Sequence, residues 1–268
     1  MKKSIILLMM SLLAVAGRAQ VKDSVVMLAN DSISDAVVIP TVSDADSAYI
    51  QGDFLTAISM YEKIIDTQGV NASLYMNLGN AWFQQDEIAK AILCYERAYL
   101  LDPSDEDVRF NLELARTRTV DKVNPRNELF FVVWFKSLLA SLDVRQWTVV
   151  TIVVFAITIL FIGLLLFSRK SVVRKISLGL AAFFFAVSIL SYIFATTQVG
   201  RINHRDTAII MAPSVTVKST PIESGTDLFI VHEGRKVDIL DSSMKEWVEI
   251  RLEDGNTGWL PLSAIEII

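Results

Sequence analysis

Apolar residues are concentrated in two long runs near the middle of the chain. Residues 147–167 and 176–194 contain no charged side chain and comprise 21 and 19 residues. At a rise of about 1.5 Å per residue, a helix of either length covers about 30 Å, the thickness of the hydrocarbon core of a bilayer. Neither run has the polar face that a helix of a soluble protein would present to water. We therefore expect two membrane-spanning helices.

The segment between the two runs is short and basic. Residues 168–175 include Arg169, Lys170, Arg174 and Lys175. Basic loops tend to remain on the cytoplasmic side of a membrane. The pattern predicts a transmembrane hairpin over residues 147–194 with loop 168–175 in the cytoplasm and both flanking parts on the other side.

The N-terminus independently predicts export. Lys2 and Lys3 precede an apolar run over residues 5–16, and small residues follow as far as Ala19. This order is typical of a secretory signal peptide, here residues 1–19. An uncleaved anchor is the alternative, but about 12 apolar residues are fewer than the roughly 20 that a span requires. Both signals favour the inner (cytoplasmic) membrane, with periplasmic N- and C-terminal domains.

A third apolar stretch covers residues 129–142. It contains Phe130, Phe131, Trp134 and Phe135 and is interrupted by Lys136. Such a composition suits a helix lying in the outer membrane interface, and packing against the two spans is the alternative. The polar stretches beside it predict linkers over residues 20–42 and, together with this helix, over residues 117–146.

Helical periodicity with a 34-residue repeat occurs between residues 43 and 116. Ala57 and Tyr61 recur as Ala91 and Tyr95. A period of 34 residues is that of helix-turn-helix repeats. The second copy resembles the tetratricopeptide repeat family at the structural positions Tyr75, Leu78, Gly79, Trp82, Ala91, Tyr95, Ala98 and Pro103.

The tetratricopeptide resemblance implies an all-α array with a capping helix and a concave groove that binds protein partners. It places Met76, Asn80, Phe83 and Asn111 in that groove, where amide side chains could pair with an extended peptide. The alternative is that the repeats act only as a spacer. The lysine that carboxylate-binding members carry at the Met76 position is missing here, which argues against recognition of a C-terminal carboxylate.

After residue 206 the pattern changes to short alternating segments separated by turns. Five strands are expected, at residues 208–211, 214–218, 236–240, 247–252 and 258–260, with a hairpin turn around Gly255. Such a series predicts a small all-β barrel over residues 201–268.

The recurring glycines and tryptophans of this part resemble the bacterial SH3-like family. The resemblance implies binding to peptides or cell-wall components. Trp247 and Trp259 are the candidate ligand surface, since flat aromatic side chains offer a large contact area. Core packing is the alternative for each.

Composition limits the chemistry. Lys and Arg number 11 against 19 Asp and Glu in residues 20–146, and 7 against 11 in residues 200–268. Two acidic parts make nucleic acid an unfavourable partner. One cysteine and two histidines argue against a structural metal site. We find no candidate nucleophile, phosphate loop or cofactor motif, and expect a protein that is not an enzyme and needs no cofactor.

The order of parts is similar to that of the BatE family encoded in Bat aerotolerance operons. The resemblance implies a multi-domain membrane protein that acts as a periplasmic scaffold. Its implied partners are other Bat-type membrane proteins with von Willebrand A domains, in aerotolerance or envelope assembly. The alternative function is cell-wall binding or sensing through the SH3-like part.

Overall fold

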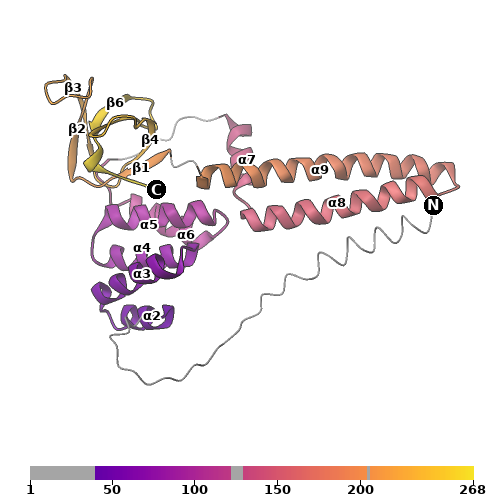
Figure 1. The fold of residues 1–268 in the computed structure, drawn as a ribbon, viewed down its shortest axis with the longest axis horizontal. Coiled ribbons are helices and arrows are strands. Elements are labelled where there is room, and N and C mark those ends of the chain that lie inside the picture. Colours follow the sequence, from indigo (N-terminus) through magenta and orange to yellow (C-terminus); the bar gives the residue numbers. More distant parts are fainter. Residues whose placement is uncertain (1–39, 122–128, 204–205) are drawn as a thin grey trace. The chain divides into compact units, whose positions relative to one another are not determined.

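The computed structural model describes residues 40–121, 129–203 and 206–268. The predicted signal peptide and nearly all of the linker over residues 20–42 lie outside these described residues. Within the described residues, a helical repeat, a helical hairpin and an antiparallel sheet follow one another along the chain (Figure 1).

The helical repeat has two helix pairs and one further helix. Its elements are α2 (Val42–Ile50), α3 (Phe54–Gln68), α4 (Ala72–Gln84), α5 (Ile88–Leu101) and α6 (Glu106–Arg116). Polar side chains start several of them: Asp53, Asn71 and Asp105 each accept a hydrogen bond from a backbone N–H of the first turn. These caps satisfy donors that the helix itself leaves unpaired. The predicted helical array is confirmed.

Small residues allow the helices of the repeat to pack closely. A Cβ atom placed on Gly79 of α4 would lie 2.7 Å from Cε1 of Tyr95 on α5. Ala57, Ala91 and Ala98 are fully buried. The closest approach of α4 and α5 therefore depends on the absence of a side chain at position 79.

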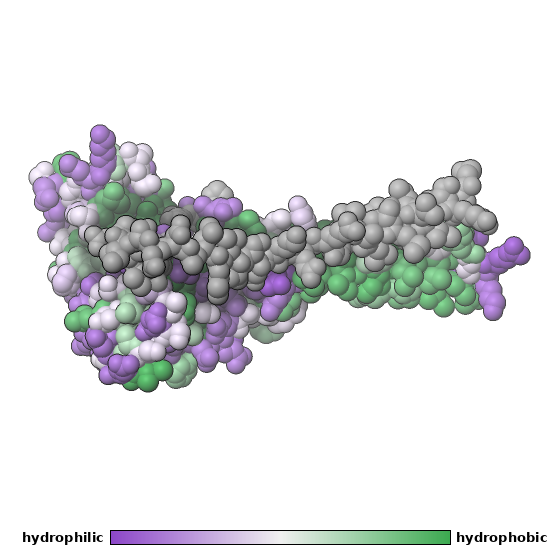
Figure 2. Space-filling model, turned by 60° about the horizontal axis from the view of Figure 1, so that its bottom comes forward, coloured by the Kyte–Doolittle hydropathy of each residue, from purple (hydrophilic) through white to green (hydrophobic). Residues whose placement is uncertain are grey.

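Three helices form the apolar part of the chain: α7 (Phe130–Leu139), α8 (Val144–Phe167) and α9 (Ser171–Asn203). Helices α8 and α9 are long and apolar enough to cross a membrane, which supports membrane association. Figure 2 shows hydrophobic residues over the hairpin and hydrophilic residues at its tip.

The basic turn is shorter than the sequence predicts. Helix α9 begins at Ser171, so only residues 168–170 connect the two long helices, and Arg174 and Lys175 belong to the start of α9. No helix-breaking residue lies between positions 171 and 175, and the helix continues. With 33 residues, α9 is about 50 Å long and extends beyond the predicted span.

The two long helices pack along a seam of mostly small side chains. On α9 the most buried positions recur at alternating intervals of three and four residues, and the buried ones are Ser177, Ala181, Ser188, Ser191, Phe194, Ala195 and Gln198. Spacing of this kind places side chains on one face, and small residues let helix backbones approach. Ser188 donates a hydrogen bond to the backbone oxygen of Thr151 across the seam, at 3.4 Å.

Helix α7 contacts the hairpin at one end. Leu139 is buried in a cluster with Trp147 and Phe194, and the indole Nε1 of Trp147 donates to the backbone oxygen of Leu139 at 3.2 Å. The aromatic side chains nearer its start, including Phe130 and Trp134, are exposed in the protein. Both expected roles therefore occur on one short helix: packing at its end and an open apolar face at its start.

The C-terminal part is one antiparallel sheet of seven strands in the order β3-β2-β6-β5-β4-β1-β7. The strands are β1 (Thr207–Ile210), β2 (Ser214–Lys218), β3 (Asp227–His232), β4 (Lys236–Asp241), β5 (Trp247–Arg251), β6 (Thr257–Pro261) and β7 (Ile265–Ile267). The all-β prediction is confirmed, but the predicted closed barrel is wrong: β3 and β7 form two edges that no ladder joins within the described residues.

The first strand, β1, is buried on both faces. Ala208 and Ile210 belong to the core of the sheet, whereas Ile209, between them, packs with Ile92 of α5 and Leu112 of α6. Alternate strand residues point to opposite faces. Strand β1 therefore joins the sheet to the helical repeat.

Candidate partner-binding surfaces

A ladder of side-chain hydrogen bonds connects successive helices of the repeat. Asp46 on α2 accepts a hydrogen bond from the hydroxyl of Tyr61 on α3 at 2.5 Å and from Nδ2 of Asn77 on α4 at 3.2 Å. One repeat later, Asn80 on α4 accepts from the hydroxyl of Tyr95 on α5 at 2.8 Å and from Nδ2 of Asn111 on α6 at 3.0 Å.

The two rungs of the ladder are related by the repeat period. Asp46, Tyr61 and Asn77 stand 34 positions before Asn80, Tyr95 and Asn111, respectively. Sequence reasoning selected Asn80 and Asn111 but missed Asp46 and Asn77. The same 34-residue comparison that aligned the two tyrosines could have found both.

A hollow of about 230 Å³ opens beside the ladder. It is lined by Asp46, Tyr49, Ile50, Tyr61, Asn77 and Asn80. Ile50 is 83% exposed, so an apolar side chain lies free at the mouth of a polar hollow. Asp46 is its one charged residue, and burial together with the Asp46 carboxylate raises the pKa of the Tyr61 hydroxyl well above its usual range. The neutral Tyr61 hydroxyl remains a hydrogen-bond donor.

The other two predicted groove residues lie elsewhere in the repeat. Met76 and Phe83 are half-buried and pack against the cluster that contains Ile92 and Leu112. The guanidinium of Arg118 lies 5.3 Å from the centroid of the Phe83 ring. The structure therefore brings Asn80 and Asn111 together and places Met76 and Phe83 in apolar packing.

Trp247 and Trp259 share one face of the sheet. Strand β5 pairs with β6 so that Glu249 opposes Trp259 and Trp247 opposes Pro261. Since residues two apart lie on the same face, the two tryptophans are diagonal neighbours. Val248 and Leu260 point to the opposite face, into the sheet core. Both indole rings are half-buried.

A shallow hollow of about 520 Å³ lies next to Trp247. Its lining residues are Glu223, Lys245, Glu246, Trp247, Pro261, Leu262 and Ser263. Charged side chains of both signs beside an indole ring can hold a polar ligand against a flat apolar surface. This hollow adds a concave element to the predicted tryptophan surface.

An ion cluster closes the junction between repeat and sheet. Glu96 of α5 is 2% exposed, and its carboxylate is bound by the guanidinium of Arg116 and by the ammonium of Lys236 on β4. Arg97 of the same helix donates to the carboxylate of Glu266 at 3.0 Å and to the backbone oxygen of Ile267 at 2.7 Å. Two charged residues of α5 thus bind the sheet.

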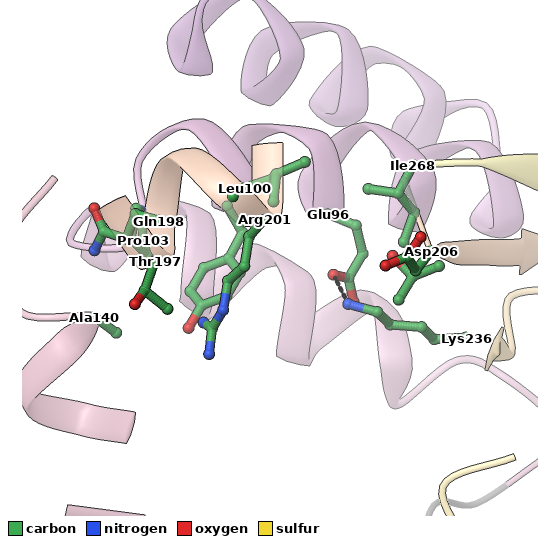
Figure 3. A pocket seen from close by; sticks show the side chains of 13 residues that line it. Glu96, Leu100, Pro103, Ala140, Thr197, Gln198, Arg201, Asp206, Lys236 and Ile268 are labelled. Carbon is green, nitrogen blue, oxygen red and sulfur yellow. Dashed lines mark hydrogen bonds and ion pairs between the residues drawn. The ribbon is translucent and has the colours of Figure 1, made fainter. Parts of the chain in front are cut away.

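A larger cavity of about 510 Å³ lies beside this cluster, where α5, the end of α9 and the sheet meet (Figure 3). Helix α9 contributes Thr197, Gln198 and Arg201, and the sheet contributes Lys236. Neither the groove residues nor the tryptophans predicted from sequence line this cavity. The signal for it is tertiary, because its walls come from segments far apart in the chain.

Cys94 is buried in the repeat, as the sequence predicted. Burial raises the pKa of its thiol to about 12, so the thiolate that would act as a nucleophile is scarce near neutral pH. Within the described parts of the chain, no group of three His, Cys, Asp or Glu side chains is placed to hold a metal ion.

Comparison with known proteins identifies one of these parts. A family model described as tetratricopeptide repeat matches residues 72–105, which contain α4 and α5. No curated protein sequence matches the chain significantly. Repeats of this family serve as scaffolds for protein–protein interaction, and here the repeat accompanies two helices suited to a membrane.

Proposed function

We propose that this chain is a membrane-anchored scaffold that binds a segment of a partner protein in the hollow beside the hydrogen-bond ladder. The observation that carries the proposal is the pairing of an exposed apolar residue, Ile50, with the acceptor oxygens of Asp46 and Asn80 around one hollow. An extended peptide offers what such a hollow can bind: backbone N–H donors and a side chain for the apolar mouth.

The hollow can be tested without disturbing the ladder. Ile50 is 83% exposed, so Ile50→Asp leaves the packing of the repeat intact. Leu55 on α3 is 64% exposed, lies outside the hollow and supplies the matched control, Leu55→Asp. A photo-crosslinking residue at position 50 in the full chain should capture a partner in membranes, and pull-down of that partner should fall about tenfold in Ile50→Asp alone. Equal recovery with both variants would contradict the proposal.

The proposed location is the inner membrane, with the repeat and the sheet on the periplasmic side. The basic turn around Arg169 and Lys170 supports this orientation. Single cysteines at positions 171 and 214, in a Cys94→Ala background, test it with a membrane-impermeant thiol reagent. We expect labelling from outside at position 214 and protection at position 171, and labelling at position 171 alone would reverse the topology.

The partner class that the sequence favours is a Bat-type membrane protein with a von Willebrand A domain, in a complex for aerotolerance or envelope assembly. An acidic scaffold fixed at the membrane suits partners that are also membrane-bound, because shared anchoring raises their effective concentration. Identification of the protein crosslinked at position 50 tests this assignment directly. A crosslinked soluble protein would argue against it.

Cell-wall binding through the sheet is the second proposal. It is supported by the two tryptophans on one outer face and by the adjacent hollow around Glu246. Co-sedimentation of the purified full chain with cell-wall sacculi should be lost in a Trp247→Ala, Trp259→Ala double variant and kept in Ile50→Asp. Absence of co-sedimentation by the unaltered chain would exclude this function.

A further inference from the structure

The cavity at the end of α9 contains a buried polar atom that no group satisfies. Gln198 is 5% exposed, and its Nε2 donates to the backbone oxygens of Leu139 at 2.7 Å and Leu142 at 2.8 Å. These two bonds fix which way the amide points, because rotation would bring its oxygen against two carbonyl oxygens. Among the described residues, no donor reaches the remaining atom, Oε1.

A buried acceptor without a partner is unfavourable, so Oε1 calls for a donor from a molecule in the cavity. Gln198 is one of the residues that line the cavity, as Figure 3 shows. A volume of about 510 Å³ lies within the range of small-molecule sites. The first requirement on a ligand is therefore an N–H or O–H group.

The second requirement comes from Arg201. It stands three residues after Gln198 on α9, so both side chains lie on the same side of the helix. Arg201 lines the cavity, and its guanidinium has no ion-pair partner among the described residues. A guanidinium presents several N–H donors in a plane and suits a phosphate group. Arg201 thus supplies the anion-binding side of the cavity.

The opposite side of the cavity is not basic. Lys236 is engaged by Glu96 at 2.7 Å, and the carboxylate of Asp206 also lines this side. Figure 3 shows Arg201 apart from the Glu96–Lys236 pair. A ligand with an anionic group at one end and a hydrogen-bond donor near it matches this division of charge, whereas a simple dianion does not.

The position of the cavity along α9 indicates where such a ligand comes from. The uncharged run ends at Phe194, and Thr197 to Arg201 follow within about 10 Å at helical rise. This is the depth at which phospholipid headgroups lie beside a membrane-spanning helix. We propose that the cavity binds the phosphate ester of a phospholipid headgroup that carries an N–H or O–H donor, with phosphate on Arg201 and the donor on Gln198.

The test uses the full chain in nanodiscs that contain equal amounts of phosphatidylethanolamine and phosphatidylcholine. Only the former headgroup has N–H donors, so the comparison tests Gln198 without altering it. After transfer to mild detergent, native mass spectrometry counts the lipids retained. We expect phosphatidylethanolamine to be retained about tenfold over phosphatidylcholine, and Arg201→Gln to remove that excess. Arg145→Gln, at an exposed arginine near the start of α8, should keep it.

The source of the ester depends on the proposed membrane placement, and a soluble probe separates the two. O-phosphoethanolamine is titrated into delipidated protein by calorimetry. Binding that Arg201→Gln abolishes, without selective lipid retention, would keep the ester site and assign it to a soluble ligand. Equal retention of both lipids together with no binding of the soluble ester would overturn the proposal and leave only water to satisfy Gln198. Equal losses in both arginine variants would also overturn it, as attraction by surface charge.

Discussion

The Nζ atom of Lys236 lies 2.7 Å from Oε2 of Glu96, so a residue of the sheet neutralises a carboxylate buried in the helical repeat. Arg116 binds the other oxygen of the same carboxylate. A buried charge is tolerated when it is paired and hydrogen-bonded. Glu96 therefore favours the arrangement in which repeat and sheet are in contact.

Lys236→Met should weaken this junction measurably. The substitution leaves Glu96 with one partner instead of two, and we expect the apparent free energy of unfolding in detergent to fall by about 1–3 kcal/mol. Lys90→Met is the control, because the Lys90–Glu87 pair is exposed to solvent and should contribute less than about 1 kcal/mol. Denaturant titration followed by tryptophan fluorescence measures both. Equal effects would show that the buried pair adds nothing.

Gly79→Ala should destabilise the repeat although alanine is the better helix former. The new Cβ would lie 2.7 Å from Cε1 of Tyr95, and such overpacking typically costs about 1–3 kcal/mol. Gly179→Ala on α9 is the matched control, because nothing lies within 4 Å of its Cβ position. Thermal unfolding of the two variants should differ in sign or size. A neutral Gly79→Ala would mean that α4 and α5 can separate freely.

The ladder predicts which substitutions are coupled. Asn80→Ala and Asn111→Ala remove two ends of one hydrogen bond, so their combined effect on stability should be smaller than the sum of the single effects. Asn77→Ala with Asn111→Ala removes parts of different rungs and should be additive. Each single change should cost about 1 kcal/mol. Additivity in the first pair would disprove the Asn80–Asn111 bond.

The contact between Asp121 and His232 should make stability depend on acid. Burial would raise the pKa of the Asp121 carboxyl, but hydrogen bonds from the backbone and imidazole of His232 outweigh it and hold that pKa below its usual range. A lowered pKa in the folded state stabilises the fold above the unfolded value of about 4, and this contribution is lost as pH falls through the folded value. The stability difference between the unaltered chain and Asp121→Asn, measured from pH 7 to pH 3, should therefore shrink below about pH 4. A constant difference would contradict this.

Alkylation of Cys94 should report on unfolding. With a thiol pKa of about 12 and 4% exposure, Cys94 should react with iodoacetamide at pH 8 many times more slowly than a free thiol. In denaturant the rate should approach that of an unstructured peptide. Fast labelling of the folded chain would show that the helices of the repeat open readily.

Local patterns were sufficient to predict several parts of this fold. The 34-residue repeat identified paired helices because each repeat must hide the same small and aromatic residues, such as Gly79 and Tyr95. The uncharged runs identified the hairpin because the bilayer sets a minimum length for a spanning helix. Asn80 and Asn111 were recognised as a pair of polar positions from the same periodicity.

Contacts between distant segments could not be predicted in this way. Ile209 lies in a strand with no apolar–polar alternation, since both of its faces are buried, and nothing local indicates that it packs on Ile92. Strands β3 and β7 were missed because one reads as a continuous apolar run and the other has three residues. The acceptor of Gln198 was invisible because its significance depends on two carbonyls more than 50 positions away.

The equal spacing of the two rungs has a consequence for how the repeat can grow. Each first helix accepts from the tyrosine that follows it and from an asparagine on the next first helix, so every rung specifies the position of the following helix. Duplication of one 34-residue unit would bring its own acceptor, tyrosine and asparagine in register. The ladder therefore acts as a template that a longer array could extend without new bonding rules.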